Sequence, residues 1–83
     1  DKWIHNFVTS QQDIAQKNFS QQPFQVDGAT GVMVRYINYT GHTIYAYSFA
    51  KSGRSWMMMI DIQGENANLP AVAQQMMDSI KLQ

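Results

Sequence analysis

Apolar side chains recur at helical spacing near the start of the chain. They fall three, four and seven residues apart on a 3.6-residue period, at Trp3, Ile4, Phe7, Val8, Ile14, Ala15 and Phe19. This stripe predicts a helix over residues 2–19. Gln11 interrupts the stripe, and Thr9 with Gln12 resembles a capping box. Two short helices that meet near Thr9 and Ser10 are therefore the alternative to one helix.

The middle of the chain has the pattern of an antiparallel meander. Pro23 ends the helical region, because proline disfavours helix at the residue before it. A short extended piece, "PFQVDG", then leads into a glycine loop. Three segments rich in β-branched and aromatic residues follow, at residues 32–39, 42–50 and 55–62. Thr40-Gly41 and Ser52-Gly53 are the expected two-residue turns between them.

A second helix is predicted after a loop at residues 63–68. Asn68 is its candidate N-cap, and Pro70 lies in its first turn, where a missing N–H costs nothing. Its apolar stripe consists of Leu69, Val72, Ala73, Met76 and Ile80. The 83 residues are thus expected to form one small α+β domain. Its predicted elements are an N-terminal helix, a three-stranded antiparallel meander and a C-terminal helix.

The segment "SWMMMIDI" at residues 55–62 lacks the alternation of a strand with one wet face. The two expected turns pair Tyr36 with Tyr45 and Tyr45 with Ile60, and this register assigns every side chain to a face. One face carries Val32, Val34, Tyr36, Tyr45, Tyr47, Phe49, Trp56, Met58, Ile60 and Ile62. The other carries Met33, Arg35, Ile37, Tyr39, His42, Ile44, Ala46, Ser48, Ala50, Met57, Met59 and Asp61. A three-residue loop in either hairpin would reverse the assignment.

The second of these faces is too apolar to stand in water alone. The second helix, a part of a longer chain or another subunit could cover it, so that the sheet is covered on both faces. Methionine is an adaptable core filler, and it also recurs on promiscuous binding surfaces. The candidate interface comprises Met33, Ile37, Ile44, Met57 and Met59, and the expected partner is another protein or a second copy in a homodimer.

Composition excludes several other classes of protein. Six Lys and Arg residues balance six Asp and Glu residues, whereas nucleic-acid binders usually have a basic excess. The absence of cysteine removes disulfides and thiolate chemistry. No apolar run approaches the about 18 residues that span a membrane. The chain does not begin with Met, and we interpret it as a piece of a longer protein rather than a processed mature chain.

The titratable residues suggest structural roles. His5 and His42 are the only histidines, and they lack the convergent partners of a metal site. Asp27 precedes a glycine and is interpreted as a turn residue, and Asp61 is expected to pair with Arg35 across the second face. We therefore expect no catalytic residue, no metal and no cofactor.

Three phrases support a family resemblance. They are "QVDG" at residues 25–28, "GRSW" followed by apolar residues at 53–60, and "SIKL" at 79–82. Their order resembles the C-terminal half of PsbP-like domains, whose bacterial relatives include DcrB-like envelope lipoproteins. The resemblance implies a sheet between helices, a periplasmic or cell-envelope location and no shared catalytic residues. Additional N-terminal strands of that family are absent here, which suggests a fragment, a reduced domain or a sheet that a second copy completes.

These observations together predict a function in binding rather than catalysis. The leading hypothesis is a non-enzymatic bacterial envelope domain that acts as a protein-binding or assembly module and self-associates. The alternative is a small immunity or inhibitor protein that neutralises a toxin or an enzyme.

Overall fold

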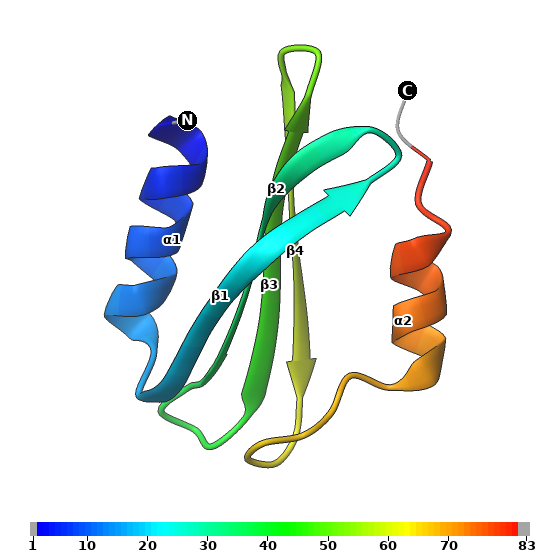
Figure 1. Ribbon diagram of the computed structural model, residues 1–83. Helices are drawn as coiled ribbons and strands as arrows, with labels where there is room; N and C mark the ends of the chain where they lie inside the picture. The colour runs from blue at the N-terminus through cyan, green and yellow to red at the C-terminus, as the bar shows by residue number, and fades with distance from the viewer. Residues whose placement is uncertain (1, 82–83) are drawn as a thin grey trace.

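The computed structural model describes residues 2–81 as two helices and one sheet. The elements are α1 (Lys2–Ile14), β1 (Lys17–Val26), β2 (Ala29–Ile37), β3 (Thr43–Lys51), β4 (Arg54–Ile62) and α2 (Ala71–Asp78). The strands form an antiparallel sheet in the order β1-β2-β3-β4. The helices lie on opposite sides of this sheet (Figure 1). The predicted α+β class and antiparallel sheet are confirmed, but the sheet has four strands rather than three.

The additional strand, β1, begins in sequence that was predicted to end the first helix and continues through residues 23–26, where the prediction of an extended piece is confirmed. α1 runs without a break past Thr9, whose Oγ1 donates to the carbonyl of His5 at 3.0 Å, and it ends at Ile14. The preference for one helix over two is therefore confirmed, and its predicted end is wrong. Asn18 has a φ of 59°, which no helix continues. Phe19 reaches the same core as α1, but from a strand whose backbone pairs with β2.

The hairpin turns decide which side chains share a face. Ser52-Gly53 joins β3 to β4 as predicted, with φ values of 53° and 79° that match a type I′ turn. The loop between β2 and β3 instead spans residues 38–42, not the two residues that were predicted. The Asn38 Oδ1 organises this loop by accepting hydrogen bonds from the Thr40 N–H at 3.1 Å and the His42 N–H at 3.0 Å.

This odd-numbered loop reverses the faces of β2 relative to β3. Tyr36 lies opposite Ile44, and Arg35 lies opposite Tyr45. The predicted pairing of Tyr36 with Tyr45 is therefore wrong, and so is the face assigned to every residue of β2 relative to the other strands. The predicted pairing of β3 with β4 is confirmed, including Tyr45 opposite Ile60.

The core on the α1 side joins one helix face to the middle of the sheet. Its buried members are Phe7, Val32, Val34, Tyr36, Ile44 and Ala46. Gln11, the polar residue on the helical stripe, is also buried, and its Oε1 accepts a hydrogen bond of 2.6 Å from the Tyr36 hydroxyl. A buried amide needs such a partner, and this hydrogen bond accounts for glutamine at a core position.

The core on the α2 side is built largely from aromatic residues. Its buried members are Val26, Ala29, Tyr45, Tyr47, Phe49 and Met77. Met77 anchors α2 with an exposed fraction of 1 %, whereas Val72 and Met76 are 74 % and 52 % exposed. The predicted stripe of this helix is therefore wrong at those two positions. Pro70, not Asn68, occupies the N-cap.

A polar network holds the loop that leads from β4 to α2. Arg35 donates from Nε to the Tyr45 hydroxyl at 3.0 Å and from Nη2 to the Ala67 carbonyl at 3.3 Å. The Ala67 N–H in turn donates to Thr43 Oγ1 at 2.9 Å. Arg35 thus lies on the α2 side of the sheet with Tyr45. The expected pair between Arg35 and Asp61 is wrong, because Asp61 belongs to the opposite face.

Candidate protein-binding edge

Strand β4 forms one edge of the sheet. Within residues 2–81 it pairs with β3 on one side, and no strand pairs with its other side. Its nine residues contain neither proline nor glycine, and the five central ones, 56–60, are apolar. A long edge strand of this kind presents unpaired backbone N–H and C=O groups that can pair with another chain.

Exposed apolar side chains accompany this free edge. Met57 and Met59 are 58 % and 51 % exposed, and Trp3 of α1 is 47 % exposed. Both methionines project to the α1 side of the sheet, because they lie opposite Ser48 and Ala46 of β3. α1 packs mainly over β2 and β3. We call Trp3, Met57, Met59 and the free edge of β4 the β4 surface.

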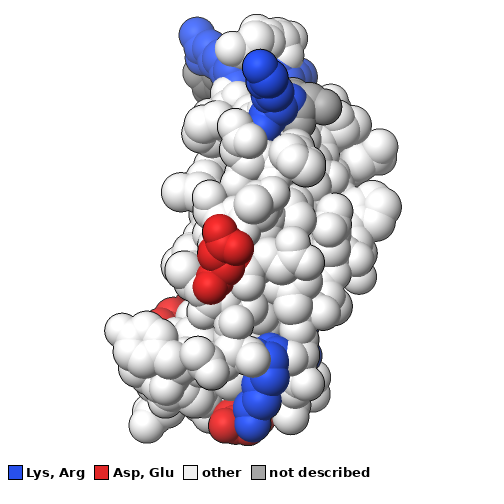
Figure 2. Space-filling model, turned by 90° about the vertical axis from the view of Figure 1, so that its left-hand side faces the viewer, with Lys and Arg blue, Asp and Glu red and all other residues white. Residues whose placement is uncertain are grey.

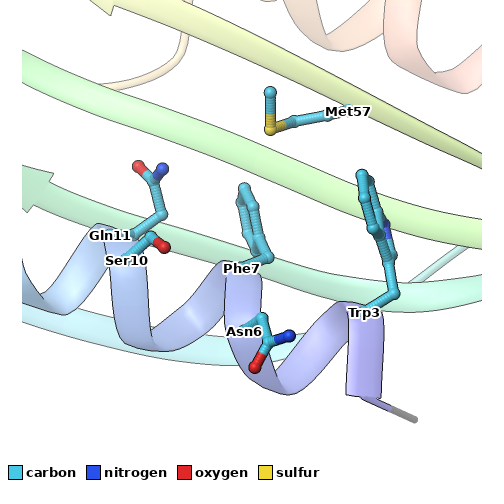
Figure 3. A pocket seen from close by; sticks show the side chains of 6 residues that line it. All are labelled: Trp3, Asn6, Phe7, Ser10, Gln11 and Met57. Atoms are coloured by element: carbon cyan, nitrogen blue, oxygen red, sulfur yellow. The ribbon is translucent and has the colours of Figure 1, made fainter.

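A groove separates α1 from β4 at this surface. It has a volume of about 400 Å³, and its walls are Trp3, Asn6, Phe7, Ser10, Gln11 and Met57. Figure 3 shows Trp3 and Phe7 rising from the helix toward the sheet, with Met57 above them. Figure 2, which looks onto the α1 side, shows Lys and Arg mainly toward the two ends of the molecule, acidic atoms near the middle, and otherwise uncharged surface. The groove is therefore suited to apolar side chains.

Polar groups border the apolar part of the β4 surface at one end. The His42 Nδ1 lies 2.7 Å from the Asp61 Oδ1, and this carboxylate is 55 % exposed. Ser48, which lies opposite Met57, is fully buried on the same face. Its hydroxyl has no hydrogen-bond partner among the described residues. His42 and Asp61 thus lie at one end of the β4 surface and Ser48 lies beneath it. The methionines occupy its centre.

The structure brings together three of the five residues of the predicted interface. Ile44, Met57 and Met59 share the α1 side of the sheet, and Ile44 is buried beneath the helix. Met33 and Ile37 have opposite parity and belong to the other face. Met33 packs against the aromatic core there. Of these five residues, Met57 and Met59 are the two that lie exposed on the α1 side.

Two features of the β4 surface were missed in the sequence. Trp3 was placed on the buried stripe of the helix, although it lies one turn closer to the N-terminus than Phe7, lines the groove and is 47 % exposed. Strand order was the other feature: β1 was not recognised, so the edges of the sheet could not be assigned. A hydrophobic residue at the end of a helical stripe is the only signal that could have identified Trp3.

Residues 2–81 offer no site for a metal ion. Three or more His, Asp or Glu side chains do not gather there in a way that could hold a metal ion. Neither α1 nor α2 is long and apolar enough to cross a membrane. In comparisons with known proteins, no family model, curated protein or solved structure matches the chain.

Proposed function

We propose that this chain is a non-enzymatic assembly module that self-associates through the β4 surface. The observation that carries the proposal is the coincidence of a free edge strand with exposed Met57, Met59 and Trp3 on the same side. A backbone edge supplies hydrogen bonds and the apolar side chains supply buried area, which are the two components of strand addition. Contiguous exposed patches of this kind mark interaction sites on soluble proteins.

The charge distribution favours a second copy as the partner. The chain has no net charge, with six basic and six acidic residues, so two copies meet without long-range repulsion. Arg54 and Asp61 carry opposite charges near the two ends of β4. Two β4 strands that run antiparallel therefore bring no like charges together at either end of the contact.

The molecular mass in solution tests this proposal. Sedimentation velocity from low to high micromolar concentration should show conversion from the 9.5 kDa chain to a species of twice that mass. Met57→Lys and Met59→Lys should each weaken this conversion at least about tenfold, because a lysine on an edge strand opposes pairing. Val72→Lys is the matched control: it replaces an apolar residue that is 74 % exposed on α2. A chain that remains monomeric at high micromolar concentration refutes the proposal.

We also propose a bacterial cell-envelope location and kinship with PsbP-like and DcrB-like domains. Both rest on the three sequence phrases at residues 25–28, 53–60 and 79–82. Cell fractionation with an antibody against the chain tests the location independently of assembly. Recovery in the cytoplasmic fraction would count against it.

A further inference from the structure

The two edges of the sheet differ in a way that selects one of them for pairing. β1 carries Pro23, an irregular register between Lys17 and Ser20, and Asn18 in the left-handed region. Proline, bulges and charged residues are the devices by which natural edge strands avoid pairing. β4 has neither a proline nor an irregular register, and its charged residues, Arg54 and Asp61, lie near its ends. Assembly through β4 therefore leaves the β1 edge of each copy on the outside. We call this edge guarded, because its proline and irregular register oppose pairing with another strand.

The turn at the start of β4 determines which backbone groups point outward. In a two-residue type I′ hairpin the residues that flank the turn, Lys51 and Arg54, exchange backbone hydrogen bonds. Hydrogen-bonded and non-hydrogen-bonded pairs then alternate along the strand. The even-numbered residues of β4 direct their backbone toward β3. The free N–H and C=O groups therefore belong to Ser55, Met57, Met59 and Asp61.

Two-fold symmetry restricts how two β4 strands can pair. A two-fold axis perpendicular to the sheet brings antiparallel strands together with the same face on the same side, so odd-numbered residues meet odd-numbered ones. An axis at Met58 aligns all nine residues of both strands. An axis at Met57 or Met59 leaves two residues of each strand without a partner. The register centred on Met58 uses every outward-facing backbone group.

Side chains agree with this register. Met57 lies opposite Met59 of the second copy, and Trp56 lies opposite Ile60. The Ser55 hydroxyl meets the Asp61 carboxylate of the second copy, to which it can donate a hydrogen bond. No like charges lie directly opposite each other in this register, and the contact therefore avoids the destabilisation that such a pair would cause.

On its side of the sheet, α1 leaves room for the contact. α1 packs mainly over β2 and β3, so four strand spacings of about 4.8 Å separate the two helix axes by about 19 Å. A helix with its side chains is about 10 Å wide, which leaves a trough of about 9 Å above the joined β4 strands. Met57, Met59 and Trp3 of both copies line this trough, and methionine and aromatic rings make favourable contacts there.

From this geometry we infer that two copies pair β4 with β4 in antiparallel register about a two-fold axis at Met58. The result is one continuous sheet of eight strands, closed as a dimer because the guarded β1 edges end it on both sides. This inference rests on the proposed self-association and specifies the partner segment and its register.

Single cysteines test the register directly, because the chain contains none of its own. Met58→Cys places each thiol on the axis in a non-hydrogen-bonded pair with a Cα separation of about 4.5 Å, within the range that disulfides span. This variant should form a covalent dimer under mild oxidation. Met57→Cys alone should not, because its copies lie diagonally, about 7 Å apart. An equal mixture of Met57→Cys and Met59→Cys should yield the mixed disulfide.

Two controls complete the design. Val72→Cys reports cross-linking by random collision from an exposed position on α2, and Met58→Cys should exceed its rate at least about tenfold. If Met58→Cys fails to fold, as judged by circular dichroism, the mixture of the two flanking variants still tests the register. Each cross-link is identified by the mass of the non-reduced species.

The possible results separate this inference from the function on which it rests. Preferential cross-linking of Met57→Cys or Met59→Cys with itself overturns the register at Met58. A dimeric mass without cross-linking at any of the three positions overturns pairing through β4, while self-association through another surface survives. A monomeric mass overturns both.

Discussion

The substitution Gly31→Ala should be among the most destabilising single changes in this protein. Gly31 lies in β2, directly between Phe24 of β1 and Phe49 of β3. A Cβ at this position would lie 1.9 Å from the Ser48 carbonyl oxygen and 2.6 Å from the Phe49 Cα. The obstacle is backbone of the neighbouring strand, so no change of rotamer relieves it. β2 and β3 must separate by about 1 Å before a methyl group fits.

The cost follows from what this separation disrupts. Two weakened backbone hydrogen bonds cost about 2 kcal/mol. The ring of Phe49 has its centroid 5.6 Å from that of Phe24 and 5.8 Å from that of Trp56, and each displaced aromatic pair costs about 0.5–1.5 kcal/mol. We therefore expect a loss of about 3–5 kcal/mol. A domain of this length has a total unfolding free energy of about 4–12 kcal/mol, so the substitution should remove at least about a quarter of it.

Urea denaturation followed by tryptophan fluorescence measures the effect. The matched control is Gly53→Ala in the turn between β3 and β4. Its Cβ would meet no atom of the described residues within 4 Å, and only its φ of 79° opposes alanine, at a cost of about 1–2 kcal/mol. If Gly31→Ala loses no more stability than Gly53→Ala, the close approach of β2 and β3 is not the constraint that we infer.

Three further changes test the cores and the buried phenols. Tyr36→Phe should cost about 1–3 kcal/mol in urea denaturation by orphaning the Gln11 amide, and adding Gln11→Leu should recover much of that loss. Ser48→Ala should raise the unfolding free energy by about 1 kcal/mol, because it removes a buried hydroxyl without a partner among the described residues; a loss would indicate an ordered water. Burial raises the pKa of Tyr36 and Tyr47, with smaller contributions from Asp61 and Tyr45 respectively. The stabilisation from the neutral phenols should thus be complete below pH 10 and be lost as pH rises above it, and stability unchanged in alkali would contradict this.

The pattern along the chain was sufficient for the elements whose neighbours are close in sequence. Ser52-Gly53 provides the φ values of a type I′ turn, so the pairing of β3 with β4 could be predicted residue by residue. The helical stripe around Phe7 also depends only on residues close in sequence, and a helix forms there. Asn38 shows where such reasoning fails: its side chain captures the Thr40 and His42 N–H groups and converts an expected two-residue turn into a five-residue loop.

The candidate surface could be predicted only in part. Met57 and Met59 were recognised because five apolar residues in succession cannot all face one core. Their exposure depends on where α1 lies, and Trp3 joins them because the helix packs over β2 and β3 rather than over β4. Helix placement is a property of the assembled core, and no short window of sequence contains it.

The sequence by itself determined the α+β class, the hairpin from β3 to β4 and the two apolar sides of β4. These depend on side-chain periodicity and turn chemistry, which act over a few residues. Only the tertiary structure decided that residues 17–22 are extended and that β1 joins the sheet, that β2 faces the other way and that β4 is a free edge. Each of these depends on backbone pairing between segments distant in the chain, where a shift of one residue exchanges the two faces of a strand.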